Sequence, residues 1–430
     1  MVGSIAQNLL IIIDTAFLGH LDVVSLGAAA LGGVFYMALM MLGFGFSIGV
    51  QIITARRYGE DRLNAIGGVL HHAFYFMIPF AAVILGVFLY AGSDILKFLV
   101  KSPDVFKATS DFMDIRIWGI FFGFIIYTCQ ALFVGIARTK IILTVTCVMV
   151  AFNILFDWLL IFGHAGFPDM GVRGAALASI IAELAGMAVY IYYICVSQKQ
   201  NLQKFGIFRR LSFNTAVMRH LIKISAPASL QTFLAVGSWF IFFVMVEKIG
   251  EQELAISNIS RSLHGILMLP VWGLAAAVNT LVSYSIGCRK PQLIWSIAGK
   301  TAIIAALSIL LLSGLVWIFS DFVISIYTNI PALGTETIKI MPAIFFSALV
   351  FGVGFIYFNA VSGTGKTHIS LLFEIISVCI YVAFCVLAVQ VWHWEFFYVW
   401  LIDGYYGAAL LLLSLLYIAY GKWNTQFQQK

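Results

Sequence analysis

Long apolar segments alternate with short polar connections along the whole chain. Each apolar run approaches the roughly 20 residues that an α-helix needs to cross about 30 Å of hydrocarbon. We therefore predict an all-α polytopic membrane protein in which no large soluble domain fits between the spans. The twelve transmembrane helices are expected at residues 1–20, 27–55, 66–91, 112–137, 141–163, 174–196, 216–247, 253–287, 294–319, 337–362, 369–391 and 396–420.

Composition supports this class. Hydrophobic residues make up 62% of the 430 residues and the mean hydropathy is +1.00, which would leave a soluble domain too little polar surface to face water. Only 10% of the residues are charged. A charge inside a span is therefore informative, because the bilayer interior strongly disfavours it.

The longest polar interruption divides the chain near its middle. We predict an N-terminal six-helix bundle at 1–196, a cytoplasmic linker at 197–215, a C-terminal six-helix bundle at 216–421 and a cytoplasmic tail at 422–430. Seventeen of the 25 Lys and Arg residues fall on the side that holds this linker. The positive-inside rule then places the linker and both termini in the cytoplasm. The basic residues thus report topology, and no nucleic-acid partner is expected.

The two halves also resemble each other in sequence. A shift of 228 residues places Gly59 on Gly287 and the segment GIARTK, from Gly135, on GTGKTH, from Gly363; the segment GAAL at Gly174 recurs at Gly407 with a shift of 233. Six helices per repeat give both halves the same orientation, so we expect parallel repeats around a central cavity. Met1 aligns with Ser229, within the seventh span, and we therefore expect the natural chain to begin upstream of Met1.

Three polar residues within spans are candidates for an ion site. Asp14 lies in the first span, and Asn153 and Asp157 lie four residues apart on one face of the fifth. A carboxylate at bilayer depth costs about 2.5–3.5 kcal/mol on insertion scales, so such residues usually have a function. We predict a proton or cation site made of these oxygen donors. The alternative is that they are hydrogen-bonded packing residues or lie near an interface.

Several segments together resemble one known family. They are DTAFLGHLDVVSLGAAAL, QIITARRYG, NILFDWLLIFG, GVRGAALAS, APASLQ and GTGKT, and their order and spacing are similar to those of the multidrug and toxic compound extrusion (MATE) family. The resemblance implies a secondary antiporter that exports amphipathic, often cationic compounds in exchange for H⁺ or Na⁺. It also implies that Asp14, Asn153 and Asp157 bind the coupling ion, as metal ligands if that ion is Na⁺, and that Ser179 contributes.

The chain departs from part of that family, because residues 231–239 and 344–359 contain no acid where some members place coupling residues in the second half. Glu183, Arg261 and Glu374 are further candidates, either for lining a cavity or for structural pairing. We expect no cofactor, no disulfide and no zinc site, and a monomer in a bacterial inner membrane. A flippase for a lipid-linked saccharide is the alternative transporter, and an enzyme is disfavoured because no nucleophile or metal set is present.

Overall fold

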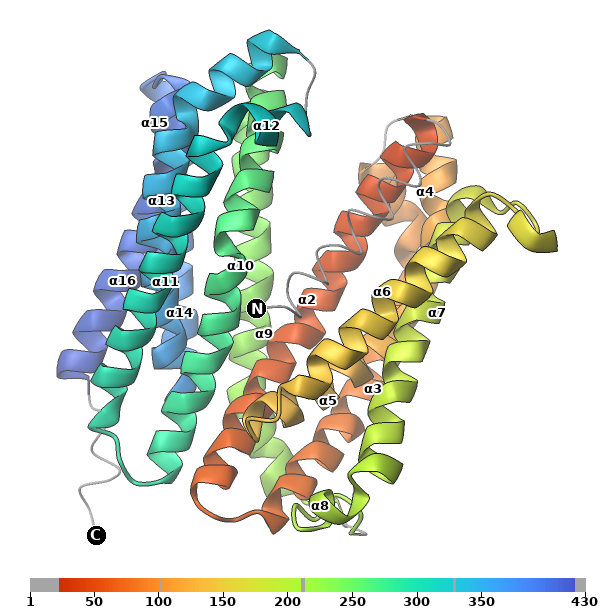
Figure 1. Cartoon of the computed structure of the whole chain (residues 1–430), viewed down its shortest axis with the longest axis vertical. Coiled ribbons are helices and arrows are strands. Elements are labelled where there is room, and N and C mark those ends of the chain that lie inside the picture. The colour runs from red at the N-terminus through yellow and green to blue at the C-terminus, as the bar shows by residue number, and fades with distance from the viewer. Residues whose placement is uncertain (1–22, 100–101, 210–212, 328–329, 422–430) are drawn as a thin grey trace. The chain divides into compact units, whose positions relative to one another are not determined.

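The computed structural model describes residues 23–99, 102–209, 213–327 and 330–421. The predicted first span, with Asp14, lies outside these residues. The described part contains helices and turns and no β-strand (Figure 1). Its long helices are α2 (Val23–Gly59), α3 (Asn64–Leu99), α4 (Pro103–Arg116), α5 (Gly119–Gly135), α6 (Lys140–Ile161), α7 (Gly171–Tyr192), α9 (Thr215–Glu247), α10 (Glu251–Gly287), α11 (Leu293–Ile318), α13 (Pro331–Gly363), α14 (Thr367–Val386) and α16 (Ile402–Tyr420). Short helices are α8 (Lys199–Gln203), α12 (Ser320–Ser325) and α15 (Phe396–Trp400).

Eleven of the twelve predicted spans fall in the described part, and each coincides with a helix or a helix pair. Ten helices of the described part are long and apolar enough to cross a membrane, and the bent pair α4 and α5 brings the count to eleven if its two parts form one broken span. The predicted start of this span at residue 112 was wrong, because the helix begins at Pro103 and bends by 52° between its two parts. Asp104, Lys107 and Asp111 made α4 resemble a loop in the sequence.

The chain forms two compact units, Val2–Ser229 and Leu230–Lys430. The division falls inside α9, so the first half of this helix packs with the N-terminal unit. Leu221 and Ile224 are fully or nearly fully buried in its core, and the hydroxyl of Ser229 donates a hydrogen bond to the carbonyl oxygen of Leu42. The predicted bundle and linker boundaries remain a prediction.

Equivalent helices pack in the same way within each unit. In the first unit α2 packs on α3 and on the α4–α5 pair, which also contacts α3 and α7, and α6 packs on α7. In the second unit α10 packs on α11 and α13, α13 also contacts α11 and α16, and α14 packs on α16. The predicted two-repeat architecture is therefore confirmed by the helix pairing inside each half.

The backbone repeats at the same interval. The described part contains five non-glycine residues with positive φ. Together with one glycine they form three pairs, and the two members of each pair are 228 positions apart. The pairs are Asp61 (φ 56°) with Arg289 (58°), Ala137 (57°) with Gly365 (79°), and Ala165 (55°) with His393 (47°). Left-handed residues are uncommon outside glycine, so this coincidence shows that the loops between spans are repeated as well as the spans.

A close helix contact is repeated at the same interval. A Cβ atom added to Gly135, at the end of α5, would lie 3.2 Å from the carbonyl oxygen of Gln51 in α2. One added to Gly363, at the end of α13, would lie 2.6 Å from the carbonyl oxygen of Asn279 in α10. Small residues allow membrane helices to approach this closely.

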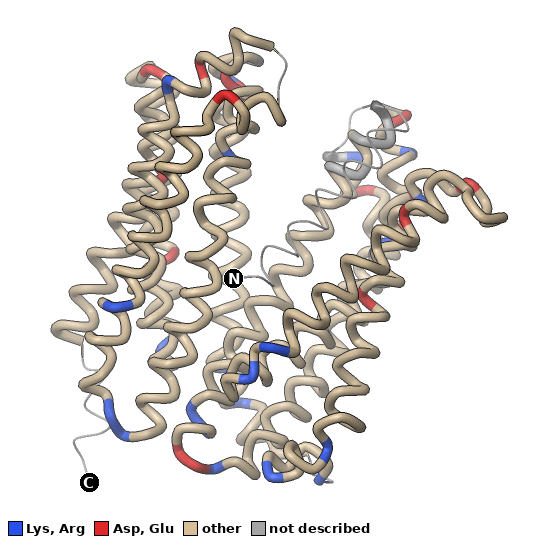
Figure 2. The backbone as a smooth tube through the Cα atoms, in the orientation of Figure 1, with Lys and Arg blue, Asp and Glu red and all other residues tan. Residues whose placement is uncertain are grey.

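Charged residues gather near the helix ends of each unit (Figure 2). In the N-terminal unit, basic residues concentrate at the connections from α2 to α3 and from α5 to α6, and around α8. In the C-terminal unit, Arg289, Lys290 and Lys366 lie at the connections from α10 to α11 and from α13 to α14. Most of the acids lie near the opposite helix ends, although the positive-inside rule itself depends on the Lys and Arg residues.

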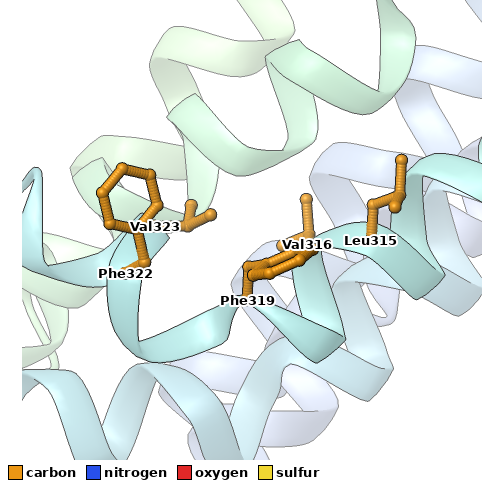
Figure 3. A pocket seen from close by; sticks show the side chains of 5 residues that line it. All are labelled: Leu315, Val316, Phe319, Phe322 and Val323. Atoms are coloured by element: carbon orange, nitrogen blue, oxygen red, sulfur yellow. The ribbon is translucent and has the colours of Figure 1, made fainter.

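Two surface hollows lie away from the predicted site. One, of about 610 Å³, is lined by Leu315, Val316, Phe319, Phe322 and Val323 where α11 turns into α12 (Figure 3). The other, of about 170 Å³, lies between α3 and α4 and includes Asp114. The first is entirely apolar in its side chains and offers no group that could bind or orient a polar ligand.

Candidate functional site

Asn153 and Asp157 lie on the face of α6 that packs against α7. Both are fully buried, with 1% and 0% of their surface exposed. They share one helical stripe with Met149 and Leu160, at spacings of three and four residues. Met149 and Leu160 both contact α7: a Cβ atom added to Gly186 would lie 2.7 Å from the Met149 side chain, and one added to Gly174 would lie 2.5 Å from the Leu160 carbonyl oxygen.

Ser179 lies on α7 at the level of these two residues. Residues 174 and 186 of α7 meet residues 160 and 149 of the antiparallel α6, so the middle of this stretch of α7 lies opposite Asn153 and Asp157. Ser179 is 8% exposed and lies seven residues, or two turns, before Gly186, on the same face. The oxygen Oδ1 of Asn153 has no hydrogen-bond partner among the described residues. The stripe can therefore offer oxygen ligands to a small ion.

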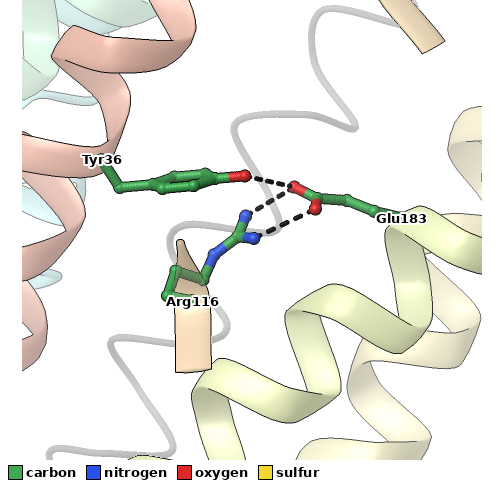
Figure 4. A network of polar contacts seen from close by, with 3 residues as sticks. All are labelled: Tyr36, Arg116 and Glu183. Carbon is green, nitrogen blue, oxygen red and sulfur yellow. Dashed lines mark hydrogen bonds and ion pairs between the residues drawn. The ribbon is translucent and has the colours of Figure 1, made fainter. Parts of the chain in front are cut away.

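Glu183 follows Ser179 by one turn of α7 and belongs to a separate network (Figure 4). The guanidinium group of Arg116, at the end of α4, donates hydrogen bonds of 2.6 and 3.0 Å to the two carboxylate oxygens. The Tyr36 hydroxyl from α2 lies 3.4 Å from the same carboxylate, and the Arg116 guanidinium carbon lies 3.8 Å from the centre of the Tyr36 ring. Glu183 is thus neutralised by a bidentate partner, which is a strong form of ion pair.

This network lies where α4 meets α5. A Cβ atom added to Gly119, the first residue of α5, would lie 2.3 Å from the Arg116 guanidinium and 2.5 Å from the Glu183 carboxylate. Glycine therefore leaves space for the ion pair at the bend. The network joins α2, α4 and α7, and its geometry favours structural pairing as the role of Glu183; that Glu183 lines a cavity stays a prediction.

Arg261 and Glu374, the other predicted cavity residues, differ in burial. Arg261 of α10 is exposed, and its guanidinium carbon lies 5.1 Å from the centre of the Phe243 ring. Glu374 of α14 is 1% exposed and accepts a hydrogen bond from the Tyr406 hydroxyl of α16. Neither of the two hollows includes these residues.

The structure also reveals polar residues that sequence reasoning missed. Asp403 of α16 is 5% exposed and His264 of α10 is 4% exposed; the imidazole Nε2 lies 3.9 Å from the carboxylate Oδ2. The Tyr381 hydroxyl of α14 donates a hydrogen bond to Asp403. The signal that could have found them was available, because Asp403 lies seven residues inside the predicted span 396–420 and His264 lies eleven residues inside 253–287.

No group of three or more His, Cys, Asp or Glu side chains suited to a metal ion is present in the described ranges. Only two of the three ligands predicted for a Na⁺ ion, Asn153 and Asp157, fall within them. Their amide and carboxylate oxygens are the ligand type that hard cations prefer.

Comparisons with known proteins agree with this architecture. The probable multidrug resistance protein NorM of Agrobacterium fabrum is 26% identical over 275 residues, which cover 64% of this chain and 58% of the relative. The corresponding protein of Thermotoga maritima is 22% identical over 387 residues, 88% of this chain and 81% of the relative. The chain thus spans less than two thirds of the Agrobacterium relative's length.

Solved structures resemble the fold over its whole length. A multidrug resistance MATE family transporter in an outward-facing conformation has a TM-score of 0.88 at 17% identity, covering 100% of this chain and 94% of that one. A MATE protein in complex with MaL6 has the same TM-score and identity and covers 95% of its own chain. The family model described as MatE matches residues 1–159 and 227–387. Since these ranges make up most of the sequence and include both repeats, the chain belongs to the MatE family.

Proposed function

We propose that this protein is a secondary antiporter that exports amphipathic, cationic organic compounds in exchange for H⁺ or Na⁺. The observation that carries the proposal is the burial of Asn153 and Asp157 on the α6 stripe that faces α7. Relatives named as probable multidrug resistance proteins support the substrate class. As a transporter and not an enzyme, the protein needs an ion site and a change of conformation.

Asp157 is the central group of the proposed ion site. Burial favours the neutral form of a carboxyl group, so Asp157 would bind a proton, or a cation would balance its charge. Asn153, one turn away, and Ser179 on α7 would supply further oxygens. Asp14, which lies outside the described residues, is proposed as the remaining ligand.

Ion binding would drive export by favouring one of two conformations. A ligand shifts such an equilibrium only by its difference in affinity for the two states. One monovalent cation crossing about 100 mV releases roughly 2.3 kcal/mol, and a tenfold concentration gradient adds about 1.4 kcal/mol. Both contributions drive export of a neutral compound, whereas a monovalent cation exchanged one for one is driven by the ion concentration gradient alone, because the exchange moves no net charge. Substrate that prefers the other conformation would then be expelled as the ion enters.

Ethidium efflux from proteoliposomes tests this function, with pH and Na⁺ gradients imposed separately. Wild-type protein should export the dye under at least one gradient, and Asp157→Asn and Asp14→Asn should each abolish gradient-driven efflux. Thr146→Ala is a matched control, because Thr146 is a buried polar residue of α6 whose hydroxyl bonds only the Ile142 carbonyl of its own helix. Efflux retained by both Asn variants under both gradients would refute the proposed site.

A flippase for a lipid-linked saccharide is the alternative. Such a protein would need basic side chains free to bind phosphate. Arg116 donates both arms of its guanidinium group to Glu183, and Arg261 is the basic residue that we predict for the cavity. Orientation follows the charge pattern: we place the linker 197–215 and both termini in the cytoplasm of a bacterial inner membrane, with a monomer as the transporting species.

A further inference from the structure

Two carboxyl groups lie deep in the Leu230–Lys430 unit without a basic partner of the kind that Glu183 has. Glu374 is 1% and Asp403 is 5% exposed. Among the described residues neither forms an ion pair with Lys or Arg. By contrast, the buried acid of the other unit, Glu183, is held by Arg116 at 2.6 Å. The charge of Glu374 and Asp403 must therefore be balanced in another way.

The two acids are arranged reciprocally between α14 and α16. Glu374 of α14 accepts a hydrogen bond from Tyr406 of α16, and Asp403 of α16 accepts one from Tyr381 of α14. Glu374 and Tyr381 are seven residues apart, and Asp403 and Tyr406 are three apart, so each pair shares one helix face. The Tyr381 and Tyr406 rings lie 5.5 Å apart, which brings the two acid–tyrosine pairs together.

His264 of α10 completes the cluster. Its Nε2 atom lies 3.9 Å from Asp403 Oδ2, beyond hydrogen-bond distance, and has no hydrogen-bond partner in the described part of the chain. Cys385 of α14 is the other titratable group close to Asp403. The neighbouring side chains from α9 and α13 are aromatic: the Trp239 ring lies 5.5 Å and the Phe351 ring 6.0 Å from the His264 ring.

We propose that Glu374 and Asp403, with Tyr406, Tyr381 and His264, form a second proton-binding site that is loaded and emptied during transport. The inference rests on the proposed antiport function and extends its coupling to the C-terminal unit. Each carboxylate takes up one proton to become a neutral carboxylic acid. Asp403 and His264 share theirs, since the pair has zero net charge whether the proton is on the carboxylate or on the imidazole.

A proton fits this site better than a larger ligand. With 1% and 5% of their surfaces exposed, the two acids are covered against an organic cation. The absence of a metal-type group of three His, Cys, Asp or Glu side chains in the described residues argues against a metal ion. Releasing a proton leaves an unpaired negative charge in an apolar bundle, which is costly. Deprotonation therefore favours a conformation of this unit in which water or a cation can reach the carboxylate.

The principal alternative is that the cluster only fastens α14 to α16, and two sets of variants separate these roles. Glu374→Gln and Asp403→Asn keep a hydrogen-bond acceptor for each tyrosine but cannot take up a proton. Tyr406→Phe and Tyr381→Phe remove the hydrogen bonds but keep both acids. If the cluster binds protons, the amide variants should lose coupling and the Phe variants should keep it. If the cluster only fastens α14 to α16, the Phe variants should lower the stability of the protein and the amide variants should not.

The experiment measures the steady-state ethidium gradient in proteoliposomes against the imposed pH difference. Each pH unit contributes about a tenfold substrate gradient for every coupled proton, so loss of one proton should lower the gradient about tenfold per imposed pH unit. We expect this loss in Glu374→Gln and Asp403→Asn. Ser414→Ala, a buried residue of α16 three turns from Asp403, should behave as wild type.

Infrared spectra of the purified protein in bilayers give a second readout, independent of transport. Glu374→Gln and Asp403→Asn should each remove absorption of a protonated carboxylic acid that wild type loses on titration to high pH, and Tyr406→Phe should retain it. Unchanged spectra and unchanged pH dependence in both amide variants would overturn the second site. Absence of ethidium efflux from wild type under any gradient would instead refute the antiport function, and the infrared result would still decide whether the acids bind protons.

Discussion

Arg116 and Glu183 lie 67 residues apart in sequence, yet they form a two-pronged ion pair with side chains only 12% and 10% exposed. Breaking a buried pair leaves a single uncompensated charge and typically costs about 3–5 kcal/mol. We therefore expect Arg116→Ala and Glu183→Gln each to lower the thermal unfolding temperature of the purified protein sharply. The measurement is thermal unfolding in detergent, monitored as the loss of monodisperse protein with rising temperature.

A second ion pair joins the same two helices and serves as the control. Arg173 of α7 bonds Asp111 of α4 at 2.6 Å, but their side chains are 57% and 32% exposed. Because exposed pairs contribute about 0–1 kcal/mol, Arg173→Ala should change the unfolding temperature little. Equal losses in Arg116→Ala and Arg173→Ala would show that burial does not decide the strength of these pairs.

The repeated left-handed residues predict opposite effects of exchanging alanine and glycine. Ala137 has φ 57° and its counterpart Gly365 has φ 79°. A left-handed conformation costs an L-residue about 1–2 kcal/mol, and glycine avoids most of that cost. Ala137→Gly should thus raise the unfolding temperature and Gly365→Ala should lower it. If both substitutions shift stability in the same direction, the two connections do not share this backbone conformation.

Much of the fold follows from the sequence because a bilayer restricts it so strongly. Apolar runs of roughly 20 residues must be helices, and a constant shift of 228 residues identified equivalent connections, such as those at Asp61 and Arg289. The exception was α4, whose charged residues at 104, 107 and 111 concealed a helix that continues into α5 after a bend.

The polar contacts were less predictable. Helical spacing places Asn153 and Asp157 on one face of α6, but it cannot identify the helix that covers this face. The same limit applies to Glu183 and Arg116, and to Glu374 and Tyr406, which lie 32 residues apart. Partners on different helices depend on how the helices pack, which one sequence does not encode as a local pattern. Asp403 shows the same limit, because its position inside the predicted span 396–420 marks it as unusual but does not identify His264 on α10 as its neighbour.

Helix packing in the C-terminal unit depends on a glycine contact between α13 and α16. A Cβ atom added to Gly407 would lie 2.3 Å from the Cα atom of Phe351, which is backbone and cannot move aside. Overpacking of this kind costs about 1–3 kcal/mol, so Gly407→Ala should lower the unfolding temperature. Gly314→Ala in α11 is the control, since no atom lies within 4 Å of its added Cβ and alanine is the better helix former. A neutral Gly407→Ala would show that the two helices are further apart.

Membrane orientation can be tested at the two ends of α7. We expect the connection before this helix to face the outside and residues after it to face the cytoplasm, because basic residues concentrate on the second side. In a chain whose six native cysteines are replaced by alanine, single cysteines are introduced by Pro168→Cys and Gln200→Cys, both at exposed positions. A membrane-impermeant maleimide added to intact cells should label Pro168→Cys and should label Gln200→Cys only after permeabilisation. The opposite pattern would invert the proposed topology, and with it the direction in which the ion gradient acts on Asp157.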